Sequence, residues 1–140
     1  MPFYAIFRID ITKQEVNMFN KATKLLKQAE QDRILLKSFI IKNEPVHSTA
    51  ERGAMCVYYY VKPGETNGIS NIEFVQKVYA KYGINLKQHV SHLDKKETPV
   101  LYIKMAEIST LNKMQQDLLF DKKIFDKKPS MLQRLFGRSK

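Results

Sequence analysis

Aromatic and basic residues recur together in three stretches of the sequence, residues 3–11, 52–61 and 100–105. In each stretch the residues alternate in the manner of a β-strand, in which successive side chains point to opposite faces. The alternation places tyrosines and basic residues on the same face. Aromatic rings can stack on nucleic-acid bases, and arginine and lysine neutralise phosphates. The candidate nucleic-acid-binding residues are Tyr4, Arg8, Arg52, Tyr58, Tyr60, Tyr102 and Lys104.

The stretch from Arg52 to Val61 is predicted to be a central strand. It is rich in β-branched and aromatic residues, and the turn sequence Lys62-Pro63-Gly64 follows it. Both faces carry large apolar side chains, which is typical of a strand in the middle of a sheet. One face holds Met55, Val57, Tyr59 and Val61, and the other holds Cys56, Tyr58 and Tyr60.

The same strand resembles the third strand of RNA-recognition-motif domains, in which a basic residue and a glycine precede alternating aromatic residues. The matching positions are Arg52, Gly53, Val57 and Tyr59, and the three residues from Ala54 to Cys56 differ from the pattern. The resemblance covers about ten residues. It implies a sheet whose open face binds single-stranded RNA.

Two histidines stand in similar triplets, His47-Ser48-Thr49 and His89-Val90-Ser91, about 40 residues apart. On a strand, the first and third side chains of a triplet share a face. The pair resembles the duplicated motif of two-histidine phosphoesterases. That resemblance implies acid and base roles for the histidines and phosphate contacts for the hydroxyls. This enzyme is a distant alternative, since His47 follows Pro45 in a polar stretch that is predicted to be a loop.

The sequence gives no support to a metal or cofactor site. His89 and His92 would point to opposite faces of a strand, so with Asp94 they do not form a set of metal ligands. Cys56 is the only cysteine, which excludes an internal disulfide and indicates a small buried apolar residue. No glycine-rich phosphate loop or nucleophile motif occurs, so we predict no catalytic residues.

Helices and further strands are expected on both sides of the predicted central strand. Thr12 and Glu15 form a capping box that begins a helix over residues 13–32, and a strand follows over residues 35–41 before a loop at 43–51. Ser70 and Glu73 form a second capping box, with a helix that ends at Gly83. Strands over 84–93 and 100–105 form a hairpin with Pro99 at the start of its second arm. A third helix begins at about residue 109.

This order of elements predicts an α+β fold of the ferredoxin-like split βαβ type, with an extra C-terminal helix. The sheet is expected to be single and antiparallel, with four or five strands, and the helices to lie mainly on one face. Residues 1–120 form the predicted domain, and residues 121–140 form a basic amphipathic extension. The other sheet face, with the tyrosines, is open unless another element or a second subunit covers it.

The formal net charge is +10, and half of it lies in residues 121–140. Such a charge attracts phosphates or acidic partners. No stretch approaches the roughly 20 apolar residues of a membrane span, and no signal peptide is recognised near the N-terminus, which predicts a cytoplasmic protein. The extension carries an amphipathic pattern that could bind a partner, and its candidate residues are Met131, Leu132, Arg134, Leu135 and Phe136.

Two functions follow as hypotheses. The first is a non-enzymatic protein that binds single-stranded RNA or DNA on the tyrosine face. The second is a protein-interaction module that binds another protein or a second copy of itself, through the same face or through the C-terminal extension.

Overall fold

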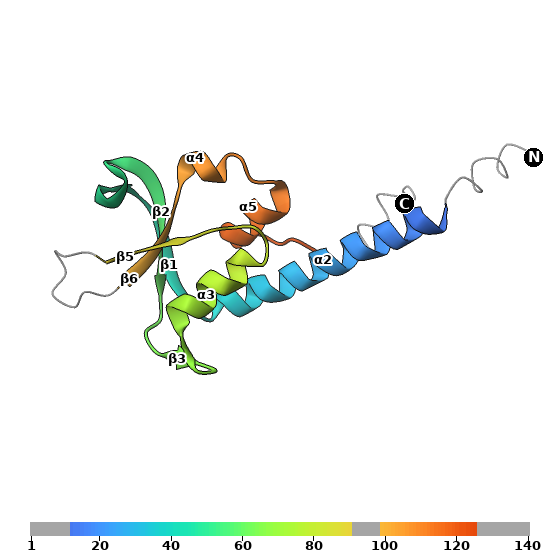
Figure 1. The fold of residues 1–140 in the computed structure, drawn as a ribbon, viewed down its shortest axis with the longest axis horizontal. Helices are drawn as coiled ribbons and strands as arrows, with labels where there is room; N and C mark the ends of the chain where they lie inside the picture. Colours follow the sequence, from blue (N-terminus) through green and yellow to red (C-terminus); the bar gives the residue numbers. More distant parts are fainter. Residues whose placement is uncertain (1–11, 91–98, 126–140) are drawn as a thin grey trace, which may run out of the picture.

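A computed structural model describes residues 12–90 and 99–125 (Figure 1). Several predictions concern residues outside these ranges and are therefore not tested. They are the strand over 3–11 with Tyr4 and Arg8, the turn of the closing hairpin, and the candidate partner-binding residues Met131, Leu132, Arg134, Leu135 and Phe136.

The described chain forms one four-stranded antiparallel sheet and a small two-stranded ladder. The strands of the sheet are β1 (Ile40–Ser48), β2 (Ala54–Val61), β5 (Lys87–Val90) and β6 (Pro99–Lys104). Their order across the sheet is β1-β2-β6-β5, so β2 is a central strand, as predicted. The ladder pairs β3 (Glu65–Thr66) with β4 (Ile69–Ser70). The β5–β6 pair confirms the closing hairpin, with Pro99 at the start of β6.

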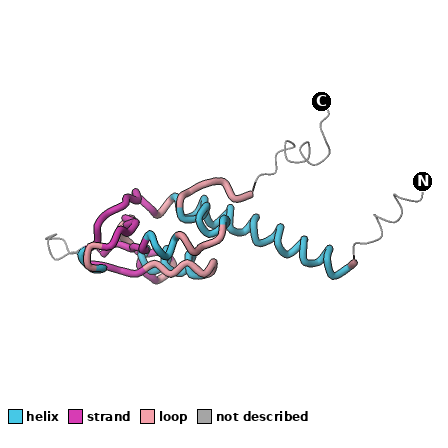
Figure 2. The backbone as a smooth tube through the Cα atoms, turned by 90° about the horizontal axis from the view of Figure 1, so that it is seen from above, coloured by secondary structure: helices cyan, strands magenta, loops and turns pink. Residues whose placement is uncertain are grey.

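In the described residues four α-helices accompany the sheet: α2 (Lys13–Lys37), α3 (Asn71–Ala80), α4 (Met105–Ile108) and α5 (Lys113–Leu119). The capping box of Thr12 and Glu15 is present at the start of α2. Ser70 caps α3 by accepting a hydrogen bond from the backbone N–H of Glu73. Helix α2 packs on the domain only through its C-terminal half, and its N-terminal half projects away from the sheet (Figures 1 and 2).

The core lies between one face of the sheet and the helices. Val57, Tyr59 and Val61 of β2 are buried there, which confirms the alternation predicted for this strand. Leu101 and Ile103 of β6 share the face because they pair directly with Tyr59 and Val57. The helices contribute Ala29, Leu36, Val75, Val78, Tyr79, Ile108, Leu118 and Leu119, and the segment between α3 and β5 adds Tyr82, Ile84 and Leu86.

The predicted boundary between the first helix and the next strand is wrong. Residues 35–37 belong to α2, where Leu36 is buried one heptad after Ala29 on the helix face that meets the core. The predicted loop at 43–51 is mostly strand, since β1 continues to Ser48 along the whole of β2. Pro45 is compatible with this strand because β1 is at the edge of the sheet. On an edge strand a proline, which has no backbone N–H, can occupy a position whose N–H would not bond a neighbouring strand.

The predicted start of the last helix is also wrong. The chain forms the short helix α4 directly after β6, and α5 begins only at Lys113. Asn112 caps α5 through a complete capping box with Gln115. A local cap therefore decides where this helix starts, and the apolar spacing alone did not locate it.

The fold is α+β, but the predicted ferredoxin-like arrangement is not what the described residues form. The first described element is a helix, and β2 pairs directly with β6. The ferredoxin-like expectation placed the strand over residues 3–11 in the centre beside β2. The observed pairing leaves no place for a strand between β2 and β6.

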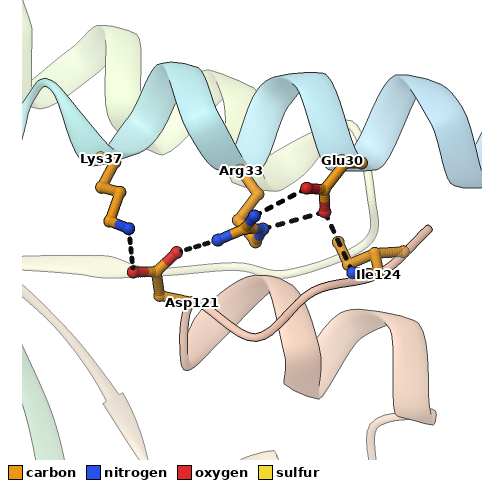
Figure 3. Close-up of polar contacts among 5 residues, drawn as sticks. All are labelled: Glu30, Arg33, Lys37, Asp121 and Ile124. Carbon is orange, nitrogen blue, oxygen red and sulfur yellow. Dashed lines mark hydrogen bonds and ion pairs between the residues drawn. The ribbon is translucent and has the colours of Figure 1, made fainter. Parts of the chain in front are cut away.

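Residues 121–125 lie against α2, held by a group of charged side chains (Figure 3). The guanidinium of Arg33 donates hydrogen bonds to Glu30 and to Asp121, and the ammonium of Lys37 lies 3.3 Å from Asp121. The carboxylate of Glu30 also accepts a hydrogen bond from the backbone N–H of Ile124 at 3.0 Å. We call Glu30, Arg33 and Asp121 the clamp, because they fasten the segment after α5 to α2.

The clamp predicts a loss of stability in acid. The hydrogen bonds from Arg33, followed by that from Ile124, lower the pKa of Glu30 from 4.5 to about 2. A carboxyl whose pKa is lower in the folded protein stabilises the fold above the pKa of the unfolded chain, near 4.5, and this contribution is lost as the pH falls toward about 2. We expect the free energy of unfolding in urea to fall between neutral pH and about pH 3. The fall should be smaller in Glu30→Gln, and an equal fall in both proteins would contradict the assignment.

Candidate functional site

Aromatic rings gather on the sheet face that is opposite to the core. The ring centroid of Tyr58 lies 6.4 Å from that of Tyr60, 5.9 Å from that of Tyr102 and 6.1 Å from that of His89. His89 and Tyr102 also meet edge to face at 6.2 Å. We call these four residues the aromatic face. Helices α2, α3 and α5 lie on the other side of the sheet (Figure 1).

The rings of the aromatic face differ in depth. Tyr102 is only 6% exposed, and its hydroxyl donates a hydrogen bond of 2.8 Å to Glu51. Burial, followed by this contact with Glu51, raises the pKa of Tyr102 to about 12. Tyr58 and Tyr60 are half-buried, and the Tyr58 hydroxyl donates to Ser48. The surface that a ligand can reach therefore consists of Tyr58, Tyr60 and His89, which is also half-buried.

The carboxylate of Glu51 partly neutralises the positive charge beside these rings. Glu51 lies 3.2 Å from the ammonium of Lys104 and 3.7 Å from that of Lys87. The hydrogen bond from Tyr102, followed by that from Lys104, lowers the pKa of Glu51, so the carboxylate is charged at neutral pH. Lys42 lies 4.8 Å from the ring centroid of Tyr60 and 3.3 Å from Glu44.

The structure brings together four of the seven predicted nucleic-acid-binding residues, namely Tyr58, Tyr60, Tyr102 and Lys104. Arg52 is exposed and lies in the turn after the short 3₁₀ helix Thr49–Glu51. Its backbone is left-handed, with φ 55°. Tyr4 and Arg8 lie outside the described residues.

Four contributors to this face were not predicted: Lys42, Glu51, Lys87 and His89. Lys87 pairs with Tyr102, and His89 pairs with Val100, so both side chains point to the aromatic face. The alternation of residues 87–90 could have placed Lys87 and His89 on one face together. Which face that is depends on the pairing with β6, and the sequence contains no local signal for this pairing.

The two histidine triplets do not come together. His47 is in β1 opposite Met55, on the face that carries Val57 and Tyr59. His89 is on the aromatic face, on the other side of the sheet. Side chains on opposite faces cannot act on one phosphodiester, so the described geometry does not assemble the phosphoesterase pair.

Residues 12–90 and 99–125 contain neither a set of metal ligands nor a helix that could cross a membrane. Within these ranges, no group of three or more histidine, cysteine, aspartate or glutamate side chains is arranged to hold a metal ion. In the same ranges, no helix has the length and apolar character that crossing a membrane requires. Comparison of the chain with protein-family models, with curated proteins and with solved structures found no significant match. The described elements define an α+β protein with a four-stranded antiparallel sheet.

Proposed function

We propose that the protein binds single-stranded nucleic acid on the aromatic face, with bases stacked on Tyr58 and Tyr60. The observation that carries this proposal is a group of four rings on the sheet face opposite to the apolar core, in which Tyr58 contacts each of the other three. Every base has a flat aromatic surface, so stacking on such a platform tolerates different sequences. Tyr102 and His89 both contact the ring of Tyr58 and each other.

Phosphates would be neutralised by basic groups around the rings. Lys42 is next to the ring of Tyr60. Lys104 and Lys87 both lie close to the carboxylate of Glu51, which accepts the hydrogen bond from Tyr102. Arg52 is exposed and follows Glu51 in the chain. The net charge of +10, half of it in residues 121–140, would add attraction that does not depend on sequence. Binding should therefore combine a salt-sensitive part with a stacking part.

The test is fluorescence anisotropy with short labelled uridine and thymidine oligomers over a series of salt concentrations. We expect binding at low salt that weakens linearly on a logarithmic scale, with a slope of about 0.7 for each phosphate neutralised. Some affinity should remain at high salt because stacking does not depend on ions. Absence of binding at low salt would reject the proposal.

Replacing Glu51 by glutamine should strengthen this binding. The substitution keeps an oxygen that can accept the hydrogen bond from Tyr102 but removes the charge that engages Lys104 and Lys87. Two freed ammonium groups would steepen the salt dependence by up to about 1.4, at about 0.7 for each phosphate. Glu65→Gln is the matched control, because it removes the same charge from β3, outside the four-stranded sheet. Equal slopes in the two variants would show that Glu51 does not restrain the lysines.

Binding of a protein partner is the second candidate function, and exposed apolar side chains on α2 favour it. Val16, Met18 and Phe19 are 45%, 65% and 70% exposed on the projecting half of this helix. Clustered apolar groups of this kind mark contact surfaces. The two functions differ in their response to salt, since an apolar protein contact should persist where a phosphate-driven complex dissociates. Light scattering of the purified chain would also reveal self-association.

A further inference from the structure

A cavity of about 330 Å³ lies on the helix side of the sheet, where the end of α2, the start of β1 and the end of α5 meet. Its apolar wall includes Leu36, Ile40, Leu118 and Leu119, together with the rings of Tyr59 and Tyr79. This volume is at the lower end of the range of small-molecule sites in proteins. The cavity is on the opposite side of the sheet from the rings of the aromatic face.

The hydroxyl of Tyr79 is the unusual group in this wall. Tyr79 is 1% exposed, and its hydroxyl has no hydrogen-bond partner among the described residues. The neighbouring ring of Tyr59, 6.0 Å away between centroids, donates its hydroxyl to the backbone oxygen of Leu119 at 2.9 Å. In the described part of the chain no side-chain nitrogen or oxygen is both fully buried and unpartnered. The Tyr79 hydroxyl is therefore not fully buried, and Tyr79 is one of the residues that line the cavity.

The charged groups of the cavity wall are paired with one another. Arg33 donates to Glu30 and Asp121, and Lys37 lies 3.3 Å from Asp121 (Figure 3). Lys42, the remaining charged residue of the wall, lies 3.3 Å from Glu44. The three cations of the wall are thus matched by three carboxylates, Asp121 in the wall and Glu30 and Glu44 beside it. An ionised ligand would have to leave water without gaining a free counter-charge, which is unfavourable in an apolar site.

The geometry points to a binding site for a small neutral molecule with an apolar body and one oxygen that accepts a hydrogen bond from Tyr79. Ketones, aldehydes and esters of modest size have this chemistry. The apolar body would contact the leucine and isoleucine side chains, and the oxygen would satisfy a donor that the fold leaves free. This site does not depend on the proposed binding of nucleic acid.

The experiment is an NMR titration of the ¹⁵N-labelled full chain with three probes that share a six-membered carbon ring. Cyclohexanone carries the acceptor oxygen, methylcyclohexane lacks it, and cyclohexanecarboxylate is charged. We expect cyclohexanone to shift the amide signals of the cavity wall, such as those of Leu36, Ile40 and Leu119, and to bind more tightly than either other probe. No shifts, or shifts spread over the whole surface, would overturn the proposal.

Two matched variants locate the hydrogen bond. Tyr79→Phe should lower the affinity for cyclohexanone by on the order of fivefold, which is the usual effect of one hydrogen bond, and should leave the affinity for methylcyclohexane unchanged. Its melting temperature should be equal or higher, because the lost hydroxyl bonds nothing in the described fold. Tyr59→Phe should melt at a lower temperature and keep the preference for cyclohexanone. Equal losses for both probes in Tyr79→Phe would overturn the assignment of this hydroxyl.

A third variant tests the cavity itself. Ile40→Trp adds volume at a half-buried position of the wall, where the larger ring can reach the empty space. We expect all three probes to bind more weakly to this variant, whose folded state the amide spectrum would verify. Unchanged cyclohexanone binding by folded Ile40→Trp would place the probe elsewhere and contradict the proposal.

Discussion

Replacing Arg33 by methionine is expected to destabilise the protein by about 3 kcal/mol, the cost of removing one partner from a largely buried ion pair. The side chains of Arg33 and Glu30 are only 10% and 16% exposed. Methionine fills much of the space of the arginine stem but leaves both carboxylates of the clamp without their shared donor. The segment after α5 would then be held to α2 mainly by the bond between Ile124 and Glu30.

Lys37→Met provides the matched control for this prediction. Lys37 contacts the same carboxylate of Asp121, but its side chain is 65% exposed. Exposed ion pairs contribute about 0–1 kcal/mol because water and salt screen them. Urea unfolding followed by circular dichroism would measure both variants. If Arg33→Met and Lys37→Met cost the same, burial of the clamp does not determine its strength.

Replacing Tyr58 by alanine should weaken the proposed binding of single-stranded nucleic acid by about 1–3 kcal/mol, the contribution of one stacked base. Tyr58 is at the centre of the aromatic face, since its ring touches Tyr60, Tyr102 and His89. Its loss removes one stacking surface and loosens the neighbouring rings. The residual binding should depend on salt as steeply as that of the wild type, because no basic residue changes.

The control for this substitution is Tyr58→Phe, which keeps the ring and loses only the hydroxyl that donates to Ser48. We expect Tyr58→Phe to bind oligomers within about twofold of the wild type, because stacking uses the ring and not the hydroxyl. Anisotropy titrations at one salt concentration would compare the three proteins, and circular dichroism would verify their fold. Wild-type affinity in folded Tyr58→Ala would remove the aromatic face as the binding surface and favour the protein-interaction alternative.

The alternation of β2 could be predicted because it is a local property of the chain. Tyr59 and Val57 point into the core while Tyr58 and Tyr60 point away, as the two-residue period requires. The same reasoning placed Tyr102 with these tyrosines, and the pairing of Tyr58 with Tyr102 confirms it. Local caps were also readable, since Thr12 and Ser70 each accept a hydrogen bond at a helix start.

The features that could not be predicted depend on contacts between distant segments. Residues 35–41 are apolar enough for either a helix or a strand, and burial of Leu36 against the core decides in favour of the helix up to Lys37. Glu51 lies beside Tyr102 and Lys104 only because β2 and β6 pair in one particular register. The cavity beside Tyr79 is lined by residues of five elements, α2, β1, β2, α3 and α5, and no local residue pattern indicates such a gap.

Helix α2 resembles a lever that is fixed at one end. Its buried residues are Ala29, Asp32 and Leu36, and Lys13 is 16 positions before the first of them, a distance of roughly 24 Å along the helix axis. A force on the N-terminal end of α2 would therefore act far from the few buried residues that hold the helix to the domain. Among these buried residues, Asp32 accepts a hydrogen bond of 2.5 Å from the hydroxyl of Tyr82. A rotation of α2 would therefore be transmitted directly to the segment that follows α3.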